Sequence, residues 1–125
     1  MMSTAEVTAA PEAATVLTKA VLSAADRLGL RNRELAEILG SSEASISRLS
    51  QQRRLDPGDK EGELALLFLR LFRSLDALVG GDARKSQAWL NAPNSHLGGV
   101  PRDQIRRVEG LVDVVQYLDA MRGRI

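Results

Sequence analysis

A strongly apolar stretch between residues 63 and 79 constrains the fold of this chain more than any other feature. Its large side chains recur every three or four positions, which is the spacing of one helical stripe. The members of this stripe are Leu64, Leu67, Phe68, Leu71, Leu75 and Leu78. Leu66, Leu69 and Phe72 fall outside it, so the first half of the helix is apolar nearly all round. We expect a central core helix that is covered on more than one side; evidence on function must come from its flanks.

Composition limits the chemistry of the chain. Its 125 residues allow one domain or two small lobes that share a core. The chain has no cysteine and one histidine, His96, which excludes disulfides, cysteine-based zinc sites and multi-histidine metal sites. No apolar run reaches the roughly 18 residues of a membrane span, and the N-terminus lacks the pattern of a signal peptide. We therefore expect a cytoplasmic protein that needs no cofactor and no membrane.

Glycines and prolines divide the part of the chain before the core helix. Residues 1–11 are small, polar and non-periodic, which predicts a disordered tail. A helix with one apolar face is expected over residues 12–28, followed by two short helices over about 33–39 and 43–51. The Pro-Gly pair at 57–58 is a strong turn signal and is predicted to separate these helices from the core helix.

The two short helices meet the physical needs of a helix-turn-helix. Helices joined by a tight turn cross steeply only where the side chains at the crossing are small, as Ala36 is, and Gly40 can adopt the positive φ of the turn. The predicted buried positions around them are Leu35, Ile46 and Leu49. This spacing resembles the helix-turn-helix of the Xre/Cro-type repressors. The alternative is a helical hairpin that binds no DNA.

The charge pattern favours DNA binding by this segment. Between Arg27 and Arg54 there are six arginines and three glutamates, a local net charge of +3, as expected for a phosphate-binding face, although a solvated surface would have the same charge. In the second helix, Arg48 suits guanine, Gln51 suits adenine and Glu43 suits cytosine, while serines at the helix start and flanking arginines suit phosphates. The predicted DNA-binding residues are Arg33, Ser41, Ser42, Glu43, Ser45, Ser47, Arg48, Gln51 and Arg53.

A distinctive loop follows the core helix. After a short helix over about 83–90, residues 88–101 combine the sole tryptophan, two prolines, a Gly-Gly pair and asparagines that can bond their own backbone. Such a composition indicates an ordered loop that is fixed to the core by Trp89. One amphipathic helix is expected to follow, from Arg102 to about Met121, with Pro101 at its start.

This loop and the last helix resemble the C-terminal toxin-binding region of the MbcA/ParS/Xre antitoxin family. The resemblance rests on Trp89-Leu90-Asn91-x-Pro93-Asn94-x2-Leu97-Gly98-Gly99-x-Pro101 and, with the helix-turn-helix, covers roughly residues 15–125. Members of this family pair with RES-domain toxins that consume NAD or use it for ADP-ribosylation. They typically dimerise, and the complex commonly binds its own promoter.

The resemblance implies an all-α antitoxin that blocks a RES-domain toxin and represses its own operon. The residues that it places at the toxin are Trp89, Asn94, Leu97, Gly98, Gly99, Arg122, Arg124 and Ile125. In the family the extreme C-terminus lies at the entrance of the toxin's active site, which makes the two tail arginines and the terminal carboxylate candidate plugs of an NAD pocket. Internal packing is the alternative for Trp89 and Leu97, and shaping of the turn is the alternative for the glycines.

The predicted fold is all-α, with about six helices. Its predicted parts are a tail at 1–11, a helix-turn-helix region at 12–56, and a core helix with a toxin-binding lobe at 57–125. The predicted partners are a RES-domain toxin, operator DNA and a second copy of the chain, because palindromic operators need paired recognition helices. A stand-alone dimeric repressor is the alternative. An enzyme is disfavoured, because no nucleophile–base pair, metal cluster or glycine-rich phosphate loop is evident.

Overall fold

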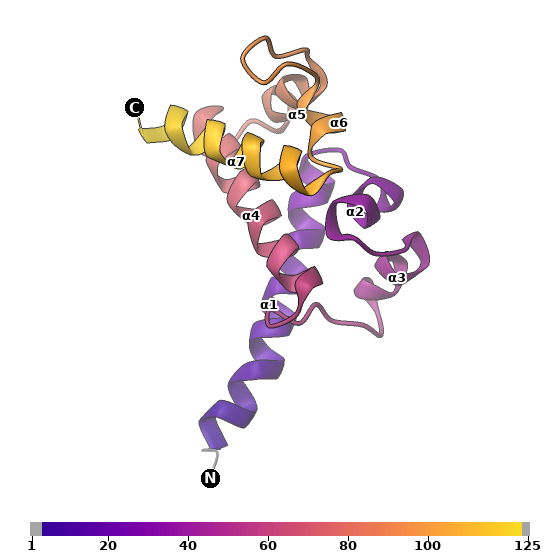
Figure 1. Ribbon diagram of the computed structural model, residues 1–125. Helices are drawn as coiled ribbons and strands as arrows, with labels where there is room; N and C mark the ends of the chain where they lie inside the picture. The colour runs from indigo at the N-terminus through magenta and orange to yellow at the C-terminus, as the bar shows by residue number, and fades with distance from the viewer. Residues whose placement is uncertain (1–3, 124–125) are drawn as a thin grey trace.

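The computed structural model describes the backbone of residues 4–123 and the side chains of residues 12–123 (Figure 1). Within this range the chain forms seven α-helices and one short 3-10 helix, which confirms the predicted all-α fold. The elements are α1 (Thr4–Arg27), α2 (Asn32–Leu39), α3 (Glu43–Ser47), the 3-10 helix η1 (Arg48–Ser50), α4 (Lys60–Leu78), α5 (Ala83–Asn91), α6 (Pro101–Gln104) and α7 (Val108–Gly123). None of the described helices combines the length and hydrophobicity that crossing a bilayer requires.

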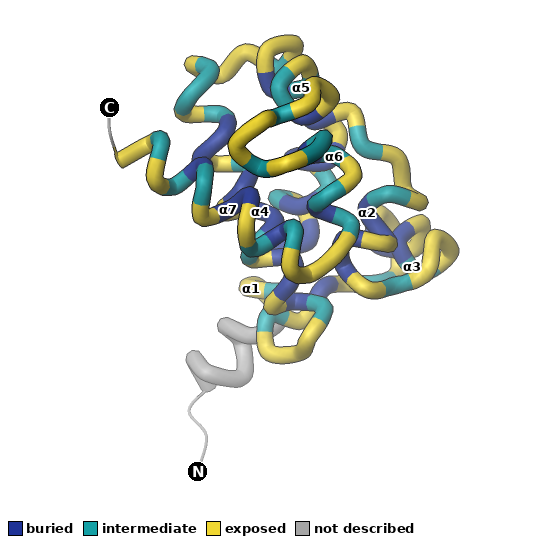
Figure 2. Tube along the Cα trace, turned by 45° about the horizontal axis from the view of Figure 1, so that its top comes forward, coloured by how far each residue is buried: buried dark blue, intermediate teal, exposed yellow. Residues whose placement is uncertain are grey.

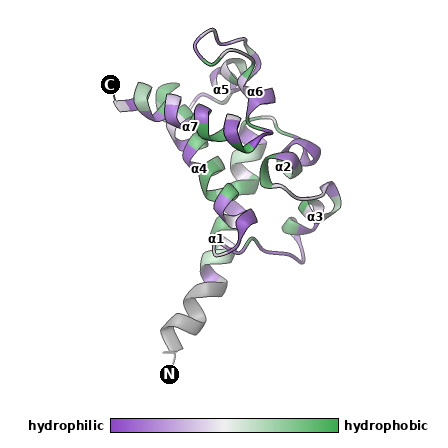
Figure 3. Cartoon of the chain, in the orientation of Figure 1, coloured by the Kyte–Doolittle hydropathy of each residue, from purple (hydrophilic) through white to green (hydrophobic). Residues whose placement is uncertain are grey.

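Helix α4 lies at the centre of this arrangement and packs against α1, α2 and, most extensively, α7. Its first half is buried on more than one side: Ala65 and Phe68 are fully inaccessible, and Leu69, outside the main stripe, is also buried. Figure 3 shows hydrophobic residues along α4 and the adjoining part of α7. In Figure 2 the loop after α5 is mostly exposed, while buried residues follow α4 and the inner sides of its neighbours.

Helix α1 begins at Thr4, earlier than the expected start at Glu12, so most of the segment expected to be a tail is helical in its backbone. The reason lies in its composition, because alanine and glutamate are strong helix formers and need no apolar periodicity to favour a helix. Residues 1–3 lie outside the described part. Further along α1, the buried Thr18 hydroxyl accepts a hydrogen bond from the Leu55 backbone N–H at 2.8 Å, which fixes the segment before α4.

The helix-turn-helix forms as its spacing predicts. Gly40 ends α2 with φ +67°, and the Ser42 side chain caps α3 by accepting from the Ser45 N–H at 3.1 Å. The expected helix over 43–51 is shorter, however: α3 ends at Ser47 and continues as η1. A tighter final turn still buries both Ile46 and Leu49, so the apolar spacing could not reveal the change of helix type.

The prediction of one continuous last helix was wrong. The chain forms α6, turns at residues 105–107 and then starts α7. The turn brings the start of α7 against the end of α6 so closely that a Cβ on Gly110 would lie 1.9 Å from the Gln104 carbonyl oxygen. Glycine is therefore required at this joint. Val108, the first residue of α7, is 59% exposed although it is apolar, because the turn changes the phase of the helix.

Candidate DNA-binding and toxin-binding surfaces

Helix α3 and η1 present a polar face to solvent. Ile46 and Leu49 point into the core, which leaves the other side of this segment outside. We call this outer side the reading face; its exposed residues are Ser42, Glu43, Ala44, Ser47, Arg48 and Gln51, and Ser45 is half-buried. Ser47 accepts a hydrogen bond from the Asn32 amide at 3.4 Å. The Arg48 side chain is exposed and makes no polar contact with the described residues, so it is available to a partner.

The predicted phosphate-binding residues lie in different environments. Arg33 is exposed at the start of α2, and Ser41 is half-buried in the turn. Arg53, in contrast, is ion-paired with Glu61 of α4, and both side chains are mostly buried. A contact between Arg53 and a phosphate would therefore require it to leave Glu61, whereas Arg33 needs no such change.

The loop between α5 and α6 is closed by its own backbone. Asn94 and Gly99 form an isolated β-bridge, with the Asn94 N–H donating to the Gly99 carbonyl at 2.8 Å. The Asn94 side chain accepts from the Leu97 N–H at 3.0 Å, and Gly98 has φ +76°. From α6, the Gln104 amide donates to the Leu97 carbonyl at 2.7 Å. These predicted toxin-binding residues thus hold the shape of the loop.

Aromatic rings fix this loop to α7. Trp89 of α5 stacks on Tyr117 of α7 with ring centroids 6.3 Å apart. The centroid of the His96 ring, in the loop, lies 4.9 Å from that of Tyr117. Trp89 and Leu97 are half-buried and pack against the core, so internal packing accounts for part of each side chain. Arg122 is exposed at the end of α7. The two remaining tail positions, Arg124 and Ile125, lie outside the described residues.

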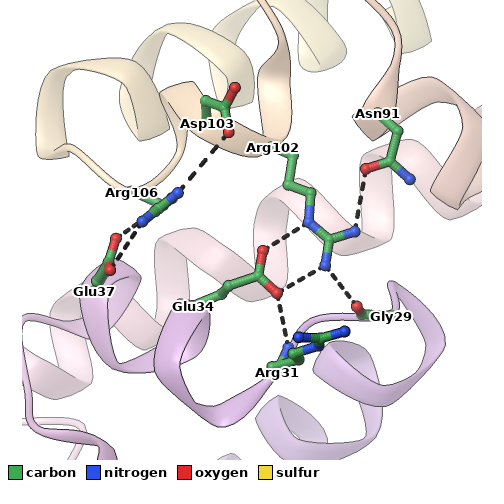
Figure 4. A network of polar contacts seen from close by, with 8 residues as sticks. All are labelled: Gly29, Arg31, Glu34, Glu37, Asn91, Arg102, Asp103 and Arg106. Carbon is green, nitrogen blue, oxygen red and sulfur yellow. Dashed lines mark hydrogen bonds and ion pairs between the residues drawn. The ribbon is translucent and has the colours of Figure 1, made fainter.

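An arginine of α6 connects three separate segments (Figure 4). Arg102 forms a two-pronged ion pair with Glu34 of α2, in which both N···O distances are 2.7 Å. It also donates to the Gly29 carbonyl at 2.8 Å and to the Asn91 side chain at 3.1 Å. Because the Glu34 and Arg102 side chains are only 17% and 23% exposed, this pair is shielded from solvent.

A second pair lies one turn along α2. Arg106 binds Glu37 through two nitrogens, one of them at 2.9 Å, and is within 3.9 Å of Asp103. The hydrogen bonds from Arg102 lower the pKa of Glu34 from 4.5 to about 2, and those from Arg106 lower the pKa of Glu37. We call Glu34, Glu37, Arg102 and Arg106 the interlobe cluster, because it joins the helix-turn-helix to the segment that follows the loop.

Neither the interlobe cluster nor Tyr117 was predicted from the sequence. A weak signal existed for the cluster, because two glutamates three apart and two arginines four apart each lie on one side of a helical turn. Nothing in the sequence indicated that the two pairs, 68 and 69 residues apart, would meet. Tyr117 carried no separate signal, since it belongs to an otherwise regular amphipathic helix.

The fold and these two surfaces define a helix-turn-helix protein with a C-terminal helical lobe. Residues 8–70 match the model of the antitoxin Xre-like helix-turn-helix domain, and residues 74–124 match that of the antitoxin Xre/MbcA/ParS C-terminal toxin-binding domain. The chain belongs to the Xre/MbcA/ParS antitoxin family. It is therefore an antitoxin with a toxin-binding domain, and not an enzyme.

A solved structure has the same fold. A chain in the crystal structure of the M. tuberculosis MbcT-MbcA toxin-antitoxin complex matches with a TM-score of 0.64 and 24% sequence identity. The match covers 88% of this chain and 96% of that one, so it includes both the helix-turn-helix and the C-terminal lobe. The search of curated proteins found no match.

Proposed function

We propose that this chain is the cytoplasmic antitoxin of an operon in which it blocks a RES-domain toxin that consumes NAD or uses it for ADP-ribosylation, and that it represses that operon. The proposal rests on one observation: the same chain matches an antitoxin helix-turn-helix domain at 8–70 and an antitoxin toxin-binding domain at 74–124. The related solved structure is itself described as a toxin-antitoxin complex.

The toxin would be bound by the C-terminal lobe. The loop over residues 92–100 is closed by the Asn94–Gly99 bridge, and its His96 ring contacts Tyr117 of α7, so the loop presents a preformed surface and loses little conformational freedom on binding. Helix α7 ends at Gly123, and the tail residues Arg124 and Ile125 follow directly. The two arginines at 122 and 124 suit polar groups that would otherwise hold a dinucleotide, which supports a role of the tail as a plug.

Repression would depend on α3 and η1. Arg48 and Gln51 are exposed and directed away from the core, and the capped start of α3 suits a phosphate contact. A palindromic operator would be read by two copies of the chain. An apolar groove of about 420 Å³ between α1 and α4 supplies a surface for the second copy, since Val16 and Leu66 on it are 67% and 49% exposed.

The proposal is tested by affinity capture of the tagged full-length chain from its native cells, with mass spectrometry of the bound proteins. We expect one RES-domain protein in stoichiometric amount. That protein, separated from the antitoxin, should consume NAD, and adding back the full chain should stop the reaction. A captured toxin that leaves NAD unchanged would contradict the NAD-directed chemistry, and capture of no toxin would contradict the antitoxin role in this operon.

Repression is tested separately by gel shift on the DNA upstream of the chain's own reading frame. We expect binding by the wild-type chain, alone or with the captured toxin, and loss of binding by Arg48→Ala. The exposed apolar groove between α1 and α4 also fits a stand-alone dimeric repressor. That alternative would gain support if the chain bound its promoter as a dimer and captured no protein.

A further inference from the structure

A groove of about 480 Å³ runs between the α5–α6 loop and the part of α7 from Asp113 to Met121. Leu97 of the loop and Met121 of α7 supply apolar walls, and Tyr117 also lines the groove. Asp113 supplies the only formal charge among the lining residues, and no lysine or arginine lines the groove. The groove lies wholly within the region that matches the toxin-binding domain.

The carboxylate of Asp113 has no ionic partner among the described residues. Asp119, six residues later on α7, makes a useful contrast. It accepts a hydrogen bond from the buried Ser74 at 2.7 Å and pairs with Arg70 of α4, so its charge is balanced within the fold. Asp113 is exposed and faces the groove instead. The groove therefore carries an unbalanced negative charge.

The Tyr117 ring is held in a fixed orientation, because Trp89 stacks on it and His96 lies 4.9 Å away. A fixed aromatic ring beside a carboxylate is a favourable site for a cation, since both the ring and the carboxylate attract positive charge. The apolar walls suit the aliphatic stem of a long basic side chain, which can lie along them while its charged end reaches Asp113.

We propose that this groove receives a lysine or arginine side chain of the toxin and that Asp113 and Tyr117 recognise it. The inference rests on the proposed toxin-binding function and names the chemistry of one contact within it. The position of the groove agrees with this role, because Met121 is adjacent to Arg122 and to the tail that is proposed to enter the toxin. A toxin that meets the tail would cover the groove as well.

The test measures the affinity of the captured toxin for charge variants of the full-length chain. Asp113→Lys should weaken binding at least about 30-fold, because it places like charges together, and Asp113→Asn should weaken it about fivefold. Glu109→Lys is the matched control: it lies one turn earlier on α7, is exposed and does not line the groove, so it should change the affinity less than about twofold. Equal affinities of Asp113→Lys and Glu109→Lys would overturn the proposal.

The role of the ring is tested by two substitutions of Tyr117. Tyr117→Phe keeps the ring and should bind within about twofold of wild type, whereas Tyr117→Leu keeps apolar bulk and should lose about fivefold. Equal binding by both variants would overturn the part assigned to the ring. Should Tyr117→Leu fail to fold, the Asp113 variants decide alone, because that exposed carboxylate supports no contact within the described fold.

Two failures can be told apart. If the wild-type chain captures no toxin, the proposed function fails and the cation site fails with it. If the wild-type chain captures a toxin and Asp113→Lys retains it as well as Glu109→Lys does, the proposed function stands and only the cation site is wrong.

Discussion

Helix α2 has eight residues, and α3 with η1 also has eight, yet most of the charged residues in these two neighbouring segments have different surroundings. On α2, Glu34 and Glu37 are both paired with arginines that follow the toxin-binding loop. On α3 and η1, Glu43 and Arg48 are exposed and form no ion pair within the described chain. The two carboxylates on α2 are therefore occupied in joining two parts of the fold, and the charges on α3 and η1 remain available to another molecule.

The comparison shows that surface charge alone does not identify a binding face. Arg33, Arg48 and Arg53 lie in one basic segment and look equivalent in sequence, but Arg53 is held by Glu61 while Arg48 has no partner in the described chain. A substitution that breaks the ion pair of Glu34 or Glu37 should accordingly change stability, whereas one at Arg48 should change binding.

The largest loss of stability is expected from Gly110→Ala, which displaces the segment that carries both arginines of the interlobe cluster. Its Cβ would lie 1.9 Å from the Gln104 carbonyl oxygen, so the joint between α6 and α7 must move. We expect the free energy of unfolding in urea to fall by about 3 kcal/mol or more. Gly123→Ala is the control, because its Cβ would meet nothing within 4 Å. Equal stability of the two variants would show that the segment between α6 and α7 can move to accept a side chain at residue 110 without loss of stability.

Arg102→Leu should have the next largest effect, because it leaves Glu34 without its partner in a mostly buried site. It also removes the bonds to Gly29 and Asn91. We expect a loss of about 3 kcal/mol in the free energy of unfolding. Arg48→Leu removes the same charge from the α3 side and should leave stability nearly unchanged, so similar losses in both variants would break the contrast between the two helices.

The contribution of Glu34 should depend on pH. Its pKa is about 2 in the folded chain against 4.5 as the ordinary value, so its stabilisation is fully present above about pH 4.5 and is lost as the pH falls toward 2. Near pH 7 we expect Glu34→Gln to be less stable than wild type by about 2 kcal/mol, after allowance for screening by solvent. Unfolding of both proteins between pH 7 and 2.5 should show this difference shrinking; a constant difference would exclude an electrostatic origin.

The smallest effect on stability is expected from Arg48→Ala, within about 0.5 kcal/mol of wild type. Its affinity for the promoter DNA should fall by about 1–3 kcal/mol, as expected when an arginine–guanine contact is lost. Arg84→Ala on α5 removes another exposed arginine and is the control. An unchanged promoter affinity with Arg48→Ala would show that the free face of α3 and η1 is not the reading face.

The elements that the sequence predicted well are those set by neighbours along the chain. The four residues that define the helix-turn-helix lie within a stretch of 14 residues: Ala36, Gly40, Ile46 and Leu49. Ala36 supplies the small side chain, Gly40 the positive φ, and Ile46 and Leu49 the buried face. The same holds for the loop, where Asn94 and Gly98 shape a turn with residues a few positions away.

The parts that the sequence did not predict depend on contacts between distant segments. The arginines of the interlobe cluster are about 70 residues from their glutamates, and neither pair has a distinctive pattern of its own. The break before α7 was hidden for a related reason. Ile105 and Leu111 are both buried, so the apolar periodicity continues across a turn that is fixed by the close approach of Gly110 to Gln104.

The stacking of Trp89 on Tyr117 has a practical consequence. Because Trp89 is the only tryptophan in the chain, all of the protein's indole fluorescence originates at one half-buried ring, in contact with a wall of the groove on α7. A molecule that entered the groove would change the surroundings of that ring and therefore its emission. The antitoxin thus contains its own optical reporter, and association with a toxin that lacks tryptophan could be followed in real time without a label.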